Sequence, residues 1–576
     1  MNYLALTYRN MVYHWKPLLA VFFGTMIGTA VLTGALMLGD SLRSSLEYIN
    51  FNRLGRIEYA LTAQNVFFGA ALDDRLSRKS ELAVASVIQA NGIAVIKGGK
   101  LRINNINIFG VDDKFWEFRN GENPAIRIPP GAVAVNRQFA GRAGLKEGDE
   151  FVLRIAKPSF VPTETVLVQE DGTASARFRV RVHEIIPDTQ LGNFSLNASQ
   201  LPPMNVFMSK GELSGKLDMQ GRANVLLANA GKSKIGESVG IGAALKDSLL
   251  LEDFGLEMSA LPGFNVYELK SKQIFISPLL SGIALASGKN AMPVFSYFIN
   301  EFSSGGRRTP YSFIAGLEQS ALPVKLADNE ILINQWLADD LNVGPGQKIE
   351  LKYYVLGPMR TLVEETVSLT VKQIVPIEGF AHDLNLMPDF PGLTRKESCK
   401  DWEPGFPIDL AKVRDKDEEY WNKYKGTPKA FVNFTVAQRL WSNKYGNLTA
   451  VRYPIADNDK AGIAKKILSS IDPKEVGLLF EPVRQDALIA AKGAVDFGQL
   501  FLGLSFFIII SALLLLSVFF ALNMEQRRPD MAILLSLGFK PSGIKRLFIY
   551  EGALIAFAGT LAGIFAGILY LHSVLF

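Results

Sequence analysis

The sequence feature that most constrains this chain is a pair of long uncharged runs near its C-terminal end. The runs cover residues 497–522 and 552–571, and neither contains Asp, Glu, Lys or Arg. About 20 consecutive apolar residues are enough for a helix to cross a lipid bilayer. We therefore predict membrane-spanning helices at 497–523 and 549–571.

The segment between the two runs is short and basic. Its cations are Arg527, Arg528, Lys540, Lys545 and Arg546. Short loops rich in Lys and Arg stay on the cytoplasmic side of a membrane. The two helices are thus predicted to form a hairpin whose bend, residues 524–548, lies in the cytoplasm.

The bend is predicted to contain a short apolar helix. Pro529 and Asp530 suit its start, because proline fits the first helical position and a carboxylate there meets the positive end of the helix dipole. Residues 531–537 are almost wholly apolar, and Gly538 suits the position just past a helix end. Such a helix must be covered by something. It could lie in the lipid headgroup layer, or it could dock in a groove on a cytoplasmic partner.

An ordered set of residues runs through this region. Its members are Arg528, Asp530, Leu537, Gly538, Arg546, Glu551, Gly552, Gly559, Gly563 and Gly567. Their order and spacing resemble the FtsX-like (MacB-type) permeases of ABC transporters. In that family a basic–acidic pair precedes an apolar helix ending in Leu-Gly, and a basic segment, a Glu-Gly pair and a glycine-spaced helix follow. Here Asp530 replaces the more usual Glu, and Pro529 precedes it.

The resemblance implies a helix that couples the chain to a dimeric ATPase and transmits nucleotide-driven motion to a large domain across the membrane. The coupling residues that we expect are Arg528, Asp530, Met531, Leu534, Leu537 and Gly538. We expect no catalytic site and no cofactor on this chain, with ATP bound by a separate cytoplasmic ABC ATPase subunit. The resemblance also implies a second permease copy or a homologous permease half as a partner.

Two functions remain open at this point. In the first, the chain is a permease subunit for export or extraction of a lipid, a lipoprotein or a hydrophobic compound. In the second, it is a membrane-anchored extracytoplasmic scaffold or regulator, for example of cell-wall hydrolases, without transport. The sequence does not name the substrate.

The N-terminal region predicts another membrane helix at residues 18–39. This run includes Gly24 and Gly28, a spacing that permits close helix packing. Basic residues precede the run and Asp40 follows it, so the N-terminus is predicted to be cytoplasmic. Residues 1–17 mix aromatic and basic side chains and are predicted to form an interfacial helix, or a frayed end over the first five residues.

Glycines in the last membrane helix predict close packing against another helix. Gly559, Gly563 and Gly567 recur every four residues and so share one face. Their partner could be the first membrane helix, through Gly24 and Gly28, or a second copy of the chain.

Glu551 lies where the last helix enters the membrane. Lys545 and Arg546 are close to it in sequence. We predict an ion pair at the cytoplasmic edge among these three residues.

Residues 40–490 contain no other run long enough to span a membrane and are predicted to be extracytoplasmic. Stalks are expected at 40–52 and 484–496. The fold class expected for the whole chain is an α-helical membrane protein with three transmembrane helices and a large α+β region of two related subdomains.

An internal repeat supports the two subdomains. Residues 133–153 match 331–351, each with a strand-like run that ends in Asn and a glycine twelve residues later. Residues 178–187 match 367–376, and 61–68 match 269–276. Alternation of apolar and polar residues in these runs is typical of half-buried strands. The repeat units are predicted at 53–215 and 264–450.

Composition excludes several other classes. The net charge of +5 is spread along the chain, so nucleic-acid binding is not indicated. The single cysteine, Cys399, excludes an intrachain disulfide, and the four histidines have no metal-ligand spacing. Gly231-Lys232-Ser233 lacks the earlier glycine that a phosphate-binding loop requires.

The resemblance implies the cytoplasmic (inner) membrane of a bacterium as the location. Members of the family have four or ten membrane helices, and this sequence has three. We therefore expect a protein truncated after residue 576, or one half of a split permease, and the sequence does not choose between a homodimer and a heterodimer.

Overall fold

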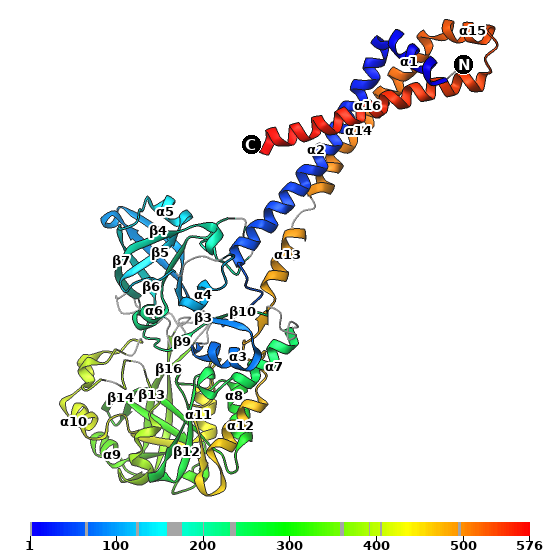
Figure 1. Ribbon diagram of the computed structural model, residues 1–576. Helices are drawn as coiled ribbons and strands as arrows, with labels where there is room; N and C mark the ends of the chain where they lie inside the picture. Colours follow the sequence, from blue (N-terminus) through cyan, green and yellow to red (C-terminus); the bar gives the residue numbers. More distant parts are fainter. Residues whose placement is uncertain are drawn as a thin grey trace. The chain divides into compact units, whose positions relative to one another are not determined.

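The computed structural model describes residues 3–63, 67–121, 126–157, 175–197, 199, 201–230, 238–356, 362–390, 392–394, 396–403, 406–493 and 497–575. Residues 231–233 and 494–496 therefore lie outside the described part. The chain forms two compact units. The helical unit comprises Met1–Arg53 and Arg484–Phe576, and the two-barrel unit comprises Leu54–Val483. Figure 1 shows the elements of each unit.

The helical unit consists of α1 (Tyr3–Tyr13), α2 (Trp15–Leu54), α13 (Val483–Gly493), α14 (Phe497–Gln526), α15 (Arg528–Ser536) and α16 (Pro541–Leu575). Within the described residues, three stretches are long and apolar enough to cross a membrane: Trp15–Ser41, Phe506–Gln526 and Pro541–Ser573. This confirms the predicted set of three transmembrane helices.

Helix α2 continues without interruption well beyond its membrane-length stretch, for 40 residues in all. Beside it runs α13, and the Asn50 side-chain amide donates to the Ala487 carbonyl over 3.1 Å. The Arg484 guanidinium lies 5.7 Å from the centre of the Phe51 ring. The two segments that enter and leave the two-barrel unit are thus joined to each other.

The first barrel is a closed sheet. Its strands, in spatial order, are β3 (Ala83–Ile96), β4 (Leu101–Val111), β8 (Asn205–Ser209), β5 (Ala132–Asn136), β7 (Ser175–Ile186) and β6 (Glu150–Ala156). Strand β6 also pairs with β3, which closes the barrel. The sheet extends from β3 through β10 (Val225–Asn229), β1 (Tyr59–Thr62) and β20 (Phe480–Glu481).

The second barrel has the same plan. Its strands, in spatial order, are β13 (Met292–Ser304), β14 (Arg307–Leu317), β18 (Ala430–Asn433), β15 (Glu330–Asn334), β17 (Leu362–Val375) and β16 (Lys348–Leu356). Strand β16 pairs back with β13. The sheet extends through β19 (Ala450–Pro454), β12 (Val266–Ser271) and β11 (Leu256–Leu261).

The repeat seen in the sequence is a repeat of topology and register. Asn136 and Asn334 each end a strand and accept a hydrogen bond from the backbone N–H three residues later, capping α5 (Arg137–Ala143) and α9 (Gln335–Leu341). The β5–β7 and β15–β17 pairs each carry a register shift one step after Val133 and Ile331. The predicted pair of related subdomains is confirmed.

The sheets also use strands from outside the predicted repeat ranges. Strands β10 and β20 lie beyond residue 215, and β11 precedes residue 264. Strands β10 and β20 pair antiparallel with β1, which brings together segments far apart in sequence, and β11 pairs antiparallel with the adjacent strand β12.

Short helices and strands complete the two-barrel unit. They are β2 (Phe68–Gly69), α3 (Leu72–Ser80), α4 (Asp113–Trp116), α6 (Lys210–Lys216), β9 (Arg222–Ala223), α7 (Ser238–Ser248), α8 (Pro278–Ser287), α10 (Asp415–Tyr424), α11 (Phe434–Trp441) and α12 (Lys460–Ser470).

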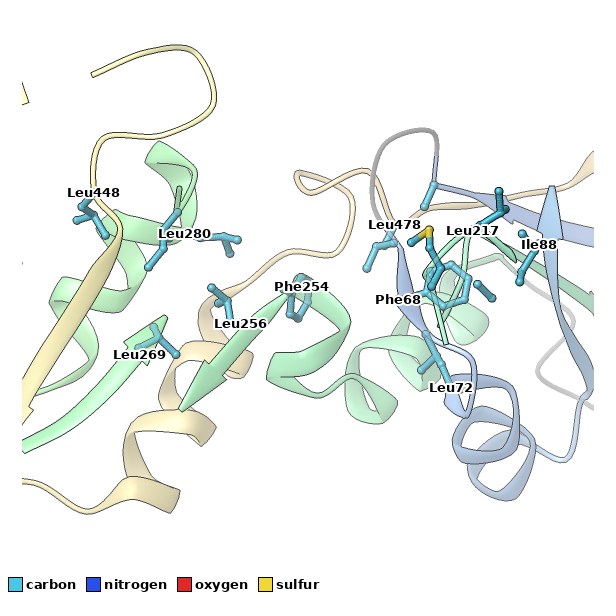
Figure 2. Packing of buried hydrophobic residues seen from close by; sticks show 14 of the residues in the cluster. Phe68, Leu72, Ile88, Leu217, Phe254, Leu256, Leu269, Leu280, Leu448 and Leu478 are labelled. Carbon is cyan, nitrogen blue, oxygen red and sulfur yellow. The ribbon is translucent and has the colours of Figure 1, made fainter. Parts of the chain in front are cut away.

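One hydrophobic core continues from the first barrel into the second. Figure 2 shows Phe254 and Leu256 between Phe68 on one side and Leu269 on the other, and all four residues are buried. Next to Phe254, the carboxylate of Asp253 accepts from the Gly69 N–H at 3.0 Å and pairs with Arg75 at 2.6 Å. Apolar burial and one buried carboxylate therefore hold the barrels together.

The loop at 379–391 is part of the fold over its described residues. Asp383 is completely buried and pairs with Arg452 at 2.6 Å, and Arg452 also pairs with Glu268 at 2.7 Å. Ala381 and Leu386 pack in a buried cluster beside β14 and β18. The ion pairs anchor this loop to strands β12 and β19.

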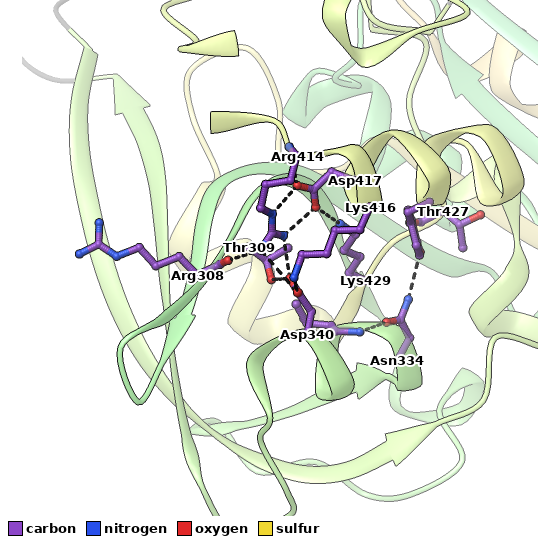
Figure 3. Close-up of polar contacts among 11 residues, drawn as sticks. Arg308, Thr309, Asn334, Asp340, Arg414, Lys416, Asp417, Thr427 and Lys429 are labelled. Carbon is purple, nitrogen blue, oxygen red and sulfur yellow. Dashed lines mark hydrogen bonds and ion pairs between the residues drawn. The ribbon is translucent and has the colours of Figure 1, made fainter. Parts of the chain in front are cut away.

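A dense polar cluster lies at one side of the second barrel (Figure 3). Arg414 pairs with Asp340 and Asp417, each at 2.7 Å, and the ammonium of Lys429 lies 3.8 Å from Asp417. Lys429 is buried, with Trp336 and Tyr420 over its ammonium group. Burial lowers the pKa of Lys429 to about 8.

We predict that Lys429 makes stability depend on pH in the alkaline range. Between pH 8 and 10.5 the unfolded chain binds more protons at this residue than the folded chain, so the contribution of Lys429 to the free energy of unfolding rises with pH through this window. The Lys429→Met variant should lack that rise. At pH 7 the variant should unfold at a higher denaturant concentration than the wild type, because the cost of burying the lysine is removed. Denaturation of the full chain in detergent, followed by tryptophan fluorescence, measures both effects.

The matched control is Lys423→Met, on the exposed side of α10. It should behave like the wild type at every pH. An unchanged pH profile in Lys429→Met would show that the buried lysine is fully compensated by its neighbours.

Candidate functional site

The candidate site is α15 together with the helix ends that hold it. Its end at Gly538 is defined by two backbone hydrogen bonds, from Gly538 N to Leu535 O at 3.0 Å and from Phe539 N to Leu534 O at 3.1 Å. Gly538 has a φ of +87°, in the left-handed region that favours glycine. This is the Schellman arrangement, so Gly538 is needed to end the helix and turn the chain into α16.

The surface of α15 is largely apolar. Ile533, Leu535 and Leu537 are 58%, 48% and 70% exposed, whereas Met531 and Leu534 are half-buried. A two-turn helix with three exposed large aliphatic side chains is a surface that water does not favour. Among the apolar residues predicted for coupling, Leu537 is the most exposed.

The two charged residues predicted for coupling have local partners. Arg528 pairs with Glu525 at 3.1 Å, and both side chains are exposed. Asp530 lies 3.0 Å from the Nε2 atom of His14. Asp530 thereby links the start of α15 to the junction between α1 and α2.

A buried ion pair lies behind α15. Glu551 Oε1 is 2.7 Å from Arg527 Nη1, and both side chains are at most 3% exposed. Asn10 donates to the other carboxylate oxygen of Glu551 at 2.9 Å. The Phe548 ring lies 4.8 Å from the Arg527 guanidinium. Glu551 therefore ties α1 and α16 to the residue that joins α14 to α15.

This geometry corrects the predicted ion pair. Glu551 contacts Arg527, and Lys545 and Arg546 are exposed. The reason is helical geometry, because α16 begins at Pro541 and residues five or six positions apart lie on different faces of a helix. Arg527 precedes Glu551 by 24 residues, and only the folding back of the hairpin brings them together.

The three glycines of α16 lie directly against α2. A Cβ atom added to Gly559, Gly563 or Gly567 would come within 2.8, 2.5 and 3.0 Å of a backbone carbonyl oxygen of α2. Those oxygens belong to Phe22, Met26 and Ala30, which are also spaced by four. Only glycine permits this backbone approach.

Gly24 and Gly28 lie on another face of α2. A Cβ atom at either position would lie 3.6 Å from α14, at Leu516 and Ala512 respectively. Of the partners that the sequence left open, the structure places the glycines of α16 against the first membrane helix, but through residues other than Gly24 and Gly28.

We predict that Glu551→Ala destabilises the helical unit by about 3–5 kcal/mol, because it leaves the Arg527 guanidinium buried without a counter-charge. Adding Arg527→Met should recover part of this loss. Lys545→Ala, which removes an exposed charge on the same helix, should change stability by no more than about 0.5 kcal/mol. Unfolding of the full chain in mixed micelles measures the free energy of unfolding of the three variants. Equal losses in Glu551→Ala and Lys545→Ala would show that the ion pair does not stabilise the helical unit.

Comparison with known proteins supports an assignment for this region. Residues 502–576 match the family model described as FtsX-like permease C-terminal. A 71-residue stretch is 36% identical to the lipoprotein-releasing system transmembrane protein LolC of Neisseria meningitidis serogroup B (strain MC58), covering 12% of this chain and 17% of that protein. The periplasmic region of MacB from Actinobacillus actinomycetemcomitans aligns with a TM-score of 0.23 at 11% identity, covering 34% of this chain and 85% of that structure.

The hairpin of α14 and α16, with α15 at its bend, is thus similar to the C-terminal part of the FtsX-like permeases. The resemblance of residues 502–576 to that family, predicted from the sequence, is confirmed. The aligned stretch spans about a sixth of the curated relative's length.

Proposed function

We propose that this chain is the membrane subunit of an ABC-type machine. In this machine a separate ATPase on the cytoplasmic side drives movement of the two-barrel unit on the opposite side of the membrane. The exposed apolar surface of α15 carries the proposal. A short helix at the bend of a membrane hairpin that exposes Ile533, Leu535 and Leu537 is suited to insertion into a groove of a partner. Under this proposal the bend and the N-terminus are cytoplasmic, and the two-barrel unit is extracytoplasmic.

The contacts around α15 provide a route for motion. Arg527 and Glu551 join the α14–α15 junction to α16, and Asn10 joins α1 to the same carboxylate. A displacement of α15 would therefore move α1, α14 and α16 together. Helix α2, held against α16 by the glycine contacts, continues as a single helix to the start of the two-barrel unit.

The proposal assigns the chemistry to a partner chain. ATP would be bound and hydrolysed by the ATPase, and this chain would contribute position and movement. A second permease copy or a homologous half would complete the membrane part, in the cytoplasmic membrane of a bacterium. The substrate class proposed is a lipid, a lipoprotein or another hydrophobic compound, which is supported by the similarity to a transmembrane protein of a lipoprotein-releasing system.

We predict that Leu537→Asp abolishes association with the ATPase, because it places a carboxylate on the most exposed apolar residue of the docking surface. The loss should exceed about tenfold in the ATPase recovered by co-purification from the native membrane. Ser536→Asp adds the same charge one residue earlier without removing an apolar contact, and should retain the ATPase. Leu534→Asp is less informative, because Leu534 is half-buried and its substitution also disturbs packing.

Two results would overturn the proposal. One is an ATPase that co-purifies equally with wild type and with Leu537→Asp. The other is a wild-type preparation, gently extracted, that brings down no nucleotide-binding subunit. The second result would favour the membrane-anchored scaffold or regulator.

A further inference from the structure

The first barrel carries a row of arginines on its outer surface, which we call the basic strip: Arg177, Arg179 and Arg181 on β7, with Arg154 on β6. All four residues are exposed. The alternate residues Ala176, Val180 and Val182 are buried and Phe178 is half-buried, as expected when successive side chains of a strand face opposite sides. The β6–β7 register sets Arg154 opposite Arg177.

Within the described part of the chain, the positive charge of the strip is only partly compensated. Glu150 lies 3.6 Å from Arg179 and 3.0 Å from Arg181, and the side chains of those arginines are still 74% and 66% exposed. Arg154 donates to the hydroxyl of Ser175 at 3.2 Å. Among the described residues, no carboxylate forms an ion pair with Arg154 or Arg177. Like charges at neighbouring positions of a sheet repel each other, so the row is costly to the fold.

The second barrel shows that the fold does not require these arginines. In the first barrel, Glu150 lies opposite Arg181, and Arg154 lies opposite Arg177. In the second barrel, the equivalent pairs are Lys348 with Thr370 and Lys352 with Thr366. The residues that correspond to Arg177, Arg179 and Arg181 are therefore Thr366, Ser368 and Thr370. The same strand in the same closed sheet is neutral at all three positions.

A hollow lies at one end of the strip. It has a volume of about 570 Å³ and is lined by Arg179, Arg181, His183, Glu150 and the loop Pro129–Gly131. Guanidinium groups bind carboxylates through two parallel hydrogen bonds, and exposed ones are free to do so.

We propose that the basic strip binds an extended acidic segment of a partner polypeptide. Alternate side chains of an extended chain repeat at about 6.6 Å, which is also the spacing of the three arginines along β7. A segment with carboxylates at every second residue would match them one for one. The strip is an outward face of the paired strands β6 and β7, so a segment that lies across it is recognised through its side chains.

The surroundings favour a peptide over an anionic lipid. Among the described residues of β5, β6 and β7 no large hydrophobic side chain is exposed, so acyl chains would find no apolar surface beside the strip. This site is distinct from α15, and its test does not depend on an ATPase.

The test uses the full chain in nanodiscs of a neutral lipid and a fluorescent peptide of alternating Glu and Ser. We expect saturable binding that weakens as the salt concentration rises. The triple variant Arg177→Thr, Arg179→Ser, Arg181→Thr installs the residues of the second barrel and should weaken binding by about tenfold. A control that removes two exposed cations from α5, Arg137→Ser with Arg142→Thr, should bind like the wild type.

Two further measurements make the outcome decisive. The reciprocal variant Thr366→Arg, Ser368→Arg, Thr370→Arg should strengthen peptide binding. Vesicles of phosphatidylglycerol should compete weakly or not at all. No saturable peptide binding, equal loss in the α5 control, or binding of the vesicles in preference to the peptide would overturn the proposal.

Discussion

The buried pair of Arg527 and Glu551 is the interaction on which the helical unit depends. Two charges taken out of water are tolerated when they face each other closely, whereas either charge left alone would be costly. Here the carboxylate is shared between Arg527 and Asn10, and the guanidinium also lies over Phe548. Because the Glu551 carboxylate joins α1, α16 and the α14–α15 junction, the elements at the bend of the hairpin are held in fixed positions.

Rigid attachment also explains why α15 can expose apolar side chains. A short apolar helix whose ends were not fixed would pack against the nearest apolar surface. The Schellman end at Gly538 and the contact of Asp530 with His14 fix both ends of the helix. The aliphatic surface between these ends is thereby kept available. In the membrane-length helices, close attachment comes from glycine, which lets the backbones of α16 and α2 approach each other.

The two barrels show how one fold can be given two surfaces. Register, bulge position and capping asparagines agree between them, because these features set strand pairing and helix start. The outward residues of β7 and β17 are not constrained in this way, since a side chain that points into water leaves the pairing unchanged. Arginines on one barrel and hydroxyl residues on the other are therefore a difference of recognition and not of architecture.

The sequence by itself determined the features that depend on local pattern. Uncharged runs of membrane length predicted the three spanning helices, the Pro529–Gly538 signals predicted α15, and the Asn-to-Gly spacing predicted the repeat, because each reflects chain geometry within a few residues. Only the tertiary structure decided the partner of Glu551, the contact of the α16 glycines with Phe22, Met26 and Ala30, and the pairing of β10 and β20 with β1 from beyond the repeat range. Each of those outcomes joins segments separated by tens or hundreds of residues, where helix rotation and strand order, and not local periodicity, determine which atoms meet.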